Sequence, residues 1–96
     1  LFCGADGNEH QRGGNYVPQM TEDAAVSVLN NCKAVLEDCT IGGKNSISVV
    51  GSGELTLRNC KVLGKTSLTG NVTLILERTT LPSPPSLTGK ARVVRR

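Results

Sequence analysis

The sequence predicts an all-β fold: a small single-stranded parallel β-helix, or solenoid, of about three to four coils. Three observations support this. The phrase "SLTG" occurs at residues 67–70 and again at 86–89. The blocks "VLEDCTIGG", "TLRNCKVLG" and "ILERTTLPS" repeat one pattern every 19–21 residues. Within each block apolar and polar residues alternate with the period of two that a half-buried strand shows.

Aligning the repeats with one another places residues of one kind in columns. Each residue then shares a column with its counterpart one coil later. An antiparallel sandwich also fits short alternating strands, but gives no reason for residue i to match residue i+20. A β-helix does, because it stacks such residues about 4.8 Å apart. The predicted inward columns are Val26, Ile47, Leu68 and Leu87; Ala34, Leu55, Leu74 and Val93; and Leu36, Leu57 and Leu76, interrupted by Arg95.

Residues 1–23 do not follow the repeat: they are polar and glycine-rich. We interpret them as an irregular N-terminal cap or linker that covers the end of the stack, which would otherwise expose unpaired backbone. The alternative is that they belong to a further coil. The coils are expected at residues 24–43, 44–64, 65–83 and 84–96, the last ending in a basic tail.

The four cysteines divide into two pairs. Cys39 and Cys60 align between coils, and we expect them to be free, buried thiols that fill space in the core. Cys3 and Cys32 are candidates for a disulfide that joins the N-terminal segment to the first repeat. Such a bridge would favour an extracellular or surface location, although nothing in the sequence assigns a compartment.

Two outward columns are candidate functional features. One alternates in sign, so that each side chain stacks on an opposite charge; this charge ladder is Glu37, Arg58, Glu77 and Arg96. The other is mostly apolar and predicts a contact surface, unless the N-terminal segment covers it. These interface candidates are Val35, Thr56, Ile75 and Val94.

The repeated motif of a strand, Asn or Asp, Cys, two residues and Gly ("LEDCTIGG", "LRNCKVLG") resembles the coils of right-handed parallel β-helix proteins. This pectate-lyase-like superfamily includes pectate lyases, phage tailspikes, bacterial adhesins and non-enzymatic binding modules. The resemblance covers about residues 24–96 and implies a right-handed coil. It specifies coil geometry and does not select one family.

The sequence shows no reactive cluster. Acids in the outward columns face opposite charges, which keeps them ionised and argues against a general acid. The single histidine, His10, stands in no triad motif. We therefore expect a non-enzymatic structural or binding module, a building block of a larger chain or assembly of the surface, fibre or adhesin type. We expect no cofactor and no metal site.

Two alternatives remain open. The chain could be a fragment of a polysaccharide-binding or polysaccharide-degrading β-helix enzyme. It could instead bind nucleic acid or an acidic partner through its basic C-terminal tail, since four of its eleven basic residues lie in the last seven positions: Lys90, Arg92, Arg95 and Arg96.

Another copy of the chain or other protein chains are the expected partners. Polysaccharide is a further candidate partner, and the lack of aromatic stacking platforms argues against nucleic acid. No run of about 18 apolar residues predicts a membrane span.

Overall fold

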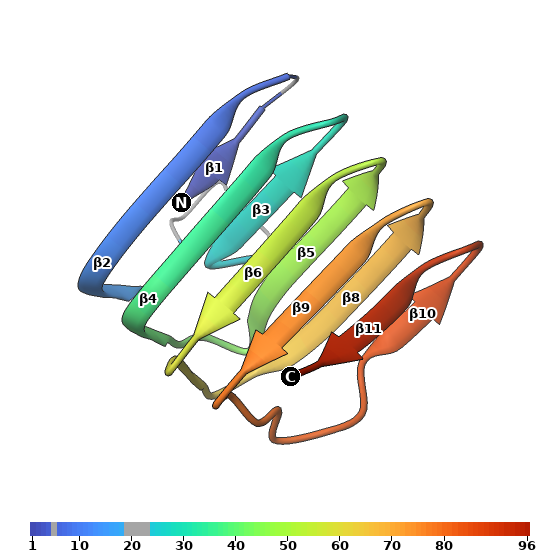
Figure 1. The fold of residues 1–96 in the computed structure, drawn as a ribbon. Coiled ribbons are helices and arrows are strands. Elements are labelled where there is room, and N and C mark those ends of the chain that lie inside the picture. The colour runs from blue at the N-terminus through green and yellow to red at the C-terminus, as the bar shows by residue number, and fades with distance from the viewer. Residues whose placement is uncertain (5, 19–23) are drawn as a thin grey trace.

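A computed structural model describes residues 1–4, 6–18 and 24–96 as a solenoid in which every strand pairing is parallel (Figure 1). This confirms the predicted all-β solenoid. Each coil contributes one strand to each of two sheets. The first sheet has the order β1 (Phe2–Cys3), β3 (Val26–Leu29), β5 (Asn45–Gly51), β8 (Lys65–Gly70) and β10 (Ser86–Thr88). The second has the order β11 (Arg92–Arg95), β9 (Thr73–Glu77), β6 (Glu54–Arg58), β4 (Lys33–Ile41) and β2 (Asn8–Tyr16), while β7 (Lys61–Val62) also pairs with β4.

The second sheet keeps the register that the sequence predicts. Ala34 pairs with Leu55, and Leu36 pairs with Leu57. The same two columns continue through Leu74 and Leu76 to Val93 and Arg95. Their aliphatic side chains from Ala34 to Leu76 are buried and form the centre of the core with the inward residues of the first sheet.

The first sheet departs from the predicted column. Ile47 pairs with Thr66 rather than Leu68, and Leu68 stacks on Val49. The cause is a register shift between Asn45 and Ile47, at which Ser46 has no partner in β8. Ser46 is fully buried, and its hydroxyl binds the carbonyls of Ile41 and Gly42 and the amide of Gly64. The inward column is therefore Val28, Val49, Leu68 and Leu87.

The interpretation of residues 1–23 as an irregular cap is wrong for the part that the structure describes. β1 pairs with β3, and β2 pairs with β4 over eight residue pairs, so this segment forms a further coil. Polar residues occupy its inward positions: Glu9 is in register with Ala34, and Gln11 with Leu36. The coil was hidden in the sequence because its inward positions lack the apolar pattern of the later coils.

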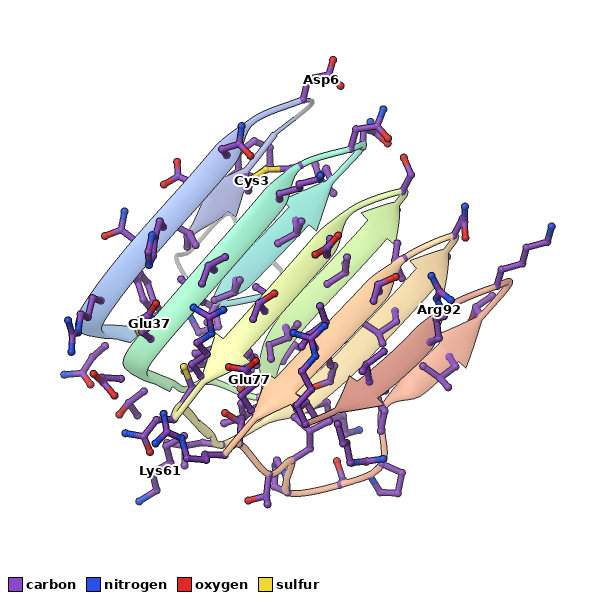
Figure 2. All side chains as sticks on the ribbon, viewed as in Figure 1. Cys3, Asp6, Glu37, Lys61, Glu77 and Arg92 are labelled. Carbon is purple, nitrogen blue, oxygen red and sulfur yellow. A yellow bond between two sulfur atoms is a disulfide. The ribbon has the colours of Figure 1, made fainter. Side chains whose placement is uncertain are left out.

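Cys3 and Cys32 form a disulfide between the first two coils, the pair that the sequence identified, with Cα atoms 5.9 Å apart (Figure 2). Cys39 and Cys60 are free and buried.

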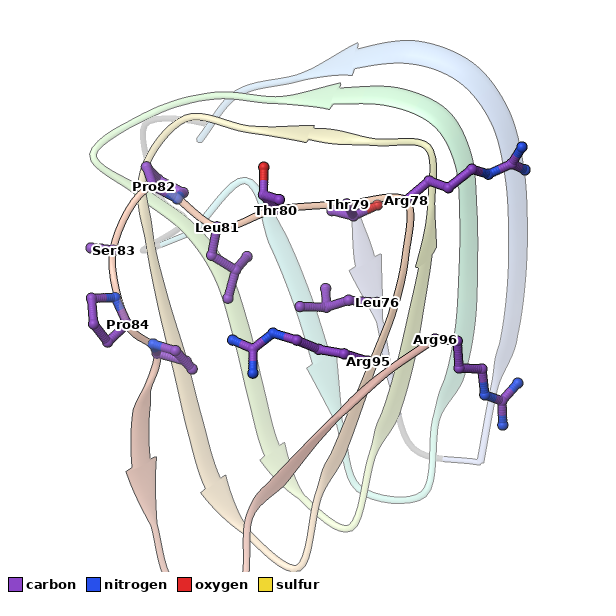
Figure 3. Close-up of a pocket in the computed structure, with 11 residues that line it drawn as sticks. Leu76, Arg78, Thr79, Thr80, Leu81, Pro82, Ser83, Pro84, Arg95 and Arg96 are labelled. Carbon is purple, nitrogen blue, oxygen red and sulfur yellow. The ribbon is translucent and has the colours of Figure 1, made fainter.

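The supposed basic tail is also part of the stack, because Arg92 to Arg95 form β11 and pair with β9. Seen from the C-terminal end, the chain turns counterclockwise as it approaches the viewer, which makes the coil right-handed (Figure 3).

Each coil turns two corners through residues with positive φ, and these corners also stack in columns. The first corner column is Asn30, Gly51, Gly70 and Gly89, and the second is Gly13, Asp38, Asn59 and Arg78. Glycine, asparagine and aspartate adopt this left-handed conformation most readily. At Gly70 space is limiting as well, since an added Cβ would lie 2.6 Å from the carbonyl oxygen of Gly51.

Arg78 is the exception in the second corner column, with φ of 50°. A left-handed conformation is unfavourable for a long side chain. We predict that Arg78→Asn raises the free energy of unfolding by about 0.5–1 kcal/mol, because asparagine tolerates this backbone conformation better. Urea unfolding at neutral pH measures the difference. Arg92→Asn, which removes the same charge at an ordinary strand position, should give no such gain, and a less stable Arg78→Asn would contradict the argument.

Candidate functional surfaces

The outer face of the second sheet carries three parallel columns of side chains, set by the strand register. Charged or polar columns flank a largely uncharged central one. The first column is Asn8, Lys33, Glu54, Thr73 and Arg92; the central column is His10, Val35, Thr56, Ile75 and Val94; the third is Arg12, Glu37, Arg58 and Glu77, followed by Arg96. The predicted charge ladder and interface candidates therefore lie side by side on one face.

The charge ladder is connected by direct ion pairs. Arg58 lies between the two acids: its Nε donates to Glu77 Oε2 at 2.7 Å, and its Nη1 to Glu37 Oε1 at 3.2 Å. Arg96 Nη1 lies 3.5 Å from Glu77 Oε1. His10 Nε2, which the sequence did not place here, lies 3.0 Å from Glu37 Oε1 and extends the ladder to the first coil. Glu37 and Glu77 are labelled on this face in Figure 2.

A second set of contacts follows the corner beside the charge ladder. Asn59 Nδ2 donates to Asp38 Oδ1 at 2.8 Å, and Arg12 Nε lies 3.5 Å from Asp38 Oδ2. These contacts were not predicted from the sequence. The signal was present in residue type, since aspartate and asparagine favour the left-handed corner that brings them together.

These contacts keep both acids ionised. The hydrogen bond with His10, supported by Arg58, lowers the pKa of Glu37 although partial desolvation opposes it. The hydrogen bond from Asn59, supported by Arg12, likewise lowers the pKa of Asp38. The hydrogen bond and charge of Glu77 raise the pKa of Arg58, with Glu37 adding to the effect. Neither Glu37 nor Asp38 has the raised pKa that a general acid needs.

The interface candidates do not form the exposed stripe that the sequence predicted. Thr56 and Ile75 are only 6% and 9% exposed, and Val35 is half-buried. In the described part of the N-terminal segment, His10 extends their column and does not cover it. Glu54 and Arg58 flank Thr56, and Glu77 lies beside Ile75; the stems of such long charged side chains cover neighbouring surface. Only Val94, at 36% exposure in the last coil, remains open.

The two free thiols are not activated nucleophiles. Burial raises the pKa of both Cys39 and Cys60, which disfavours the reactive thiolate. Cys60 Sγ lies 3.2 Å from the carbonyl oxygen of Leu36, inside the core. Thr79 occupies the next position in this column, and its hydroxyl accepts a hydrogen bond from the Cys60 amide at 3.1 Å. These residues fill and connect the core.

A cavity of about 580 Å³ opens at the C-terminal end of the solenoid (Figure 3). The connection from Thr79 to Pro85 forms one side, β11 borders the other, and Leu76 and Leu81 provide apolar lining. Figure 3 shows the Arg95 side chain lying across the end of the core, whereas those of Arg78 and Arg96 point outward. The basic residues of the supposed tail are therefore spread over different surfaces: Arg92 lies in a column of the outer face, and Arg96 pairs with Glu77.

No family model, curated protein or solved structure matches this chain. The likeness to pectate-lyase-like proteins therefore rests on coil geometry alone. Among the described residues, no helix is long and apolar enough to cross a membrane.

Because the pKa values of Glu37 and Asp38 are lowered, the stability of the fold should depend on pH. A carboxyl whose folded pKa lies below its unfolded value stabilises the fold above the unfolded value and loses that contribution as pH falls through the folded pKa. The ordinary values here are 4.5 for Glu37 and 3.8 for Asp38. We predict that acidification from pH 6 to pH 3 lowers the urea midpoint less in Glu37→Gln than in the unmodified chain.

The matched control is Glu54→Gln, on the flanking column, which should change the pH dependence less than Glu37→Gln does. Added salt should reduce the difference between the unmodified chain and Glu37→Gln at pH 6, because these pairs are accessible to solvent. Equal acid sensitivity in the unmodified chain and Glu37→Gln would show that the charge ladder does not stabilise the fold.

Proposed function

We propose that this chain is a non-enzymatic β-solenoid building block that serves as a structural or binding element of a larger chain or assembly. The observation that supports this most directly is that charged side chains on the outer face pair with one another between coils. Glu37, Glu77 and Asp38 are bound to arginine, histidine and asparagine side chains of neighbouring coils. The side chains that would carry chemistry instead connect one coil to the next.

The enzymatic alternative needs a different arrangement. Glycoside hydrolysis uses two carboxyl groups, typically with pKa values set apart so that one is protonated and the other ionised. Here Glu37 and Asp38 are neighbours in sequence, and the pKa of each is lowered. The pair therefore lacks the asymmetry that acid and base roles require.

The edges of the sheets support a role in assembly. Within the described part of the chain, β1 and β2 stand at one end of the two sheets, and β10 and β11 at the other. Each of these strands pairs on one side only, so backbone donors and acceptors remain open on its other side. Such edges favour pairing with a further strand, whether from the same chain or another.

A second candidate function is the binding of an acidic partner at the C-terminal end. The cavity there combines apolar lining with the guanidinium of Arg95, which forms no ion pair with the residues that the structure describes. A guanidinium is well suited to binding carboxylates, sulfates and phosphates. Electrostatic binding of this kind weakens steeply as salt rises.

We predict that the solution mass of the chain, measured by light scattering, rises above the 10.1 kDa monomer as protein concentration increases. Val35→Lys tests whether the chain associates through the outer face. The mass should not change, because the charged columns on either side of Val35 keep a flat partner surface away from it. Constant monomer mass, together with polysaccharide turnover that disappears in Asp38→Asn, would overturn the proposed function and favour the enzymatic alternative.

A further inference from the structure

One asparagine of the chain stands in the sequence pattern that accepts N-linked glycans. This pattern is Asn, any residue except proline, and then Ser or Thr. Of the asparagines in the chain, only Asn71 begins it, in the run Asn71-Val72-Thr73. The pattern is short and arises often by chance, so its structural context decides whether it can be used.

The three residues alternate between the surface and the core. Asn71 is exposed, Val72 is 1% exposed, and Thr73 is the half-buried first residue of β9. Val72 belongs to the hydrophobic core, and residues on either side of an inward-facing residue point outward. The carboxamide and the hydroxyl that the pattern requires therefore both face away from the core.

The backbone around Asn71 is fixed by the preceding coil. Asn71 lies at the corner between β8 and β9, on the outside of the stack (Figure 1). Its amide donates to the carbonyl oxygen of Gly51 at 2.9 Å, and the amide of Thr73 donates to that of Gly53 at 3.2 Å. These hydrogen bonds hold the corner in place and use neither the Asn71 carboxamide nor the Thr73 hydroxyl.

The corner also leaves room for a sugar. Gly70, directly before Asn71, stacks on Gly51, so neither residue places a side chain beside the carboxamide. The positions that correspond to Asn71 in the coils before and after it are Ser52 and Lys90, and both are exposed. A glycan on Asn71 would extend from the corner into solvent and leave the outer faces of the two sheets uncovered.

The disulfide between Cys3 and Cys32 is an independent observation that points to the same modification. Disulfides form and persist in the lumen of the endoplasmic reticulum and in secreted proteins, and they are rare in the cytosol. Asparagine glycosylation likewise belongs to surface loops of secreted proteins. The disulfide and the glycosylation pattern therefore support one route for the chain.

Asn31 provides a comparison within the same molecule. It occupies the equivalent corner two coils earlier, because Lys33, Glu54 and Thr73 share one column. Asn31 is exposed as well, and its Oδ1 accepts a hydrogen bond from the Ser52 hydroxyl. The residue two positions after Asn31 is Lys33, so this corner lacks the hydroxyl that the pattern requires.

We propose that Asn71 is an N-glycosylation site, modified as the chain passes through the secretory pathway. The donor is an oligosaccharide linked to a lipid pyrophosphate. Nδ2 of Asn71 forms a bond to C1 of the first sugar, and the bond between C1 and the pyrophosphate oxygen breaks. The electron pair of that bond leaves with the lipid pyrophosphate, and the amide nitrogen gives up one proton to the medium. This inference does not rest on the proposed function.

Expression of the full chain behind a cleavable signal sequence in a eukaryotic host tests the proposal. Intact mass spectrometry of the secreted and the cell-retained chain should give a mass above 10.1 kDa, with the glycan as the difference. A peptide N-glycosidase hydrolyses a glycosylated asparagine to aspartate. Treatment should return the mass to that of the chain, and peptide mapping should locate the new aspartate at position 71.

Matched variants separate the acceptor from the rest of the corner. Asn71→Gln removes the acceptor, and Thr73→Val removes the hydroxyl but keeps the branched shape, so both should lose the glycan. Thr73→Ser keeps a hydroxyl and should keep the glycan. Asn31→Gln changes the equivalent corner and should leave the modification as it is in the unmodified chain.

Two results would overturn the proposal. The first is a chain whose signal sequence has been removed but which carries no glycan, because removal of the signal shows that the chain entered the secretory pathway. The second is a glycan that persists in Asn71→Gln or in Thr73→Val. Circular dichroism before and after removal of the glycan should agree, and a strand signal lost only in the glycosylated chain would show that the corner does not accommodate a glycan.

Discussion

The structure depends on one constraint: each residue lies one strand spacing, about 4.8 Å, from its counterpart in the next coil. Aliphatic counterparts pack well at this distance, which is why Leu36, Leu57 and Leu76 form one buried column. Like charges would repel, and the outer face accordingly alternates Glu37, Arg58 and Glu77. At the corners the constraint combines with a left-handed backbone, which favours glycine, asparagine and aspartate in stacked positions.

The same constraint explains how much could be predicted from the sequence. The columns of the second sheet and the charge ladder were readable, because every coil from residue 33 onward repeats them without a shift. The register of the first sheet was harder to predict. Ser46 is an extra residue in β5, so Leu68 pairs with Val49 and not with Ile47. No local pattern marked this bulge, because serine suits a turn as well as a buried position with three hydrogen-bond partners.

The first coil and the outer face were misread for a related reason, because pattern reasoning assigns burial from residue type. Glu9 and Gln11 look exposed by type but occupy inward positions at the end of the stack. Thr56 and Ile75 point outward but are buried between longer neighbours. The cavity beside Arg95 lay beyond sequence reasoning entirely, since it depends on how the connection to Pro85 passes the end of the core.

Regular stacking also limits where this molecule can be specific. In the middle coils the charge ladder pairs Glu37, Arg58 and Glu77 between neighbouring coils, which stabilises the face. In the first and last coils described, the inward columns change from aliphatic to charged residues, as at Glu9 and Arg95. A charge in an inward column is unfavourable if it is covered by apolar residues and favourable if it is covered by an opposite charge. A neighbouring coil that offers an opposite charge therefore suits Glu9 and Arg95 better than an apolar one, whereas the aliphatic columns of the middle coils stabilise the stack through burial.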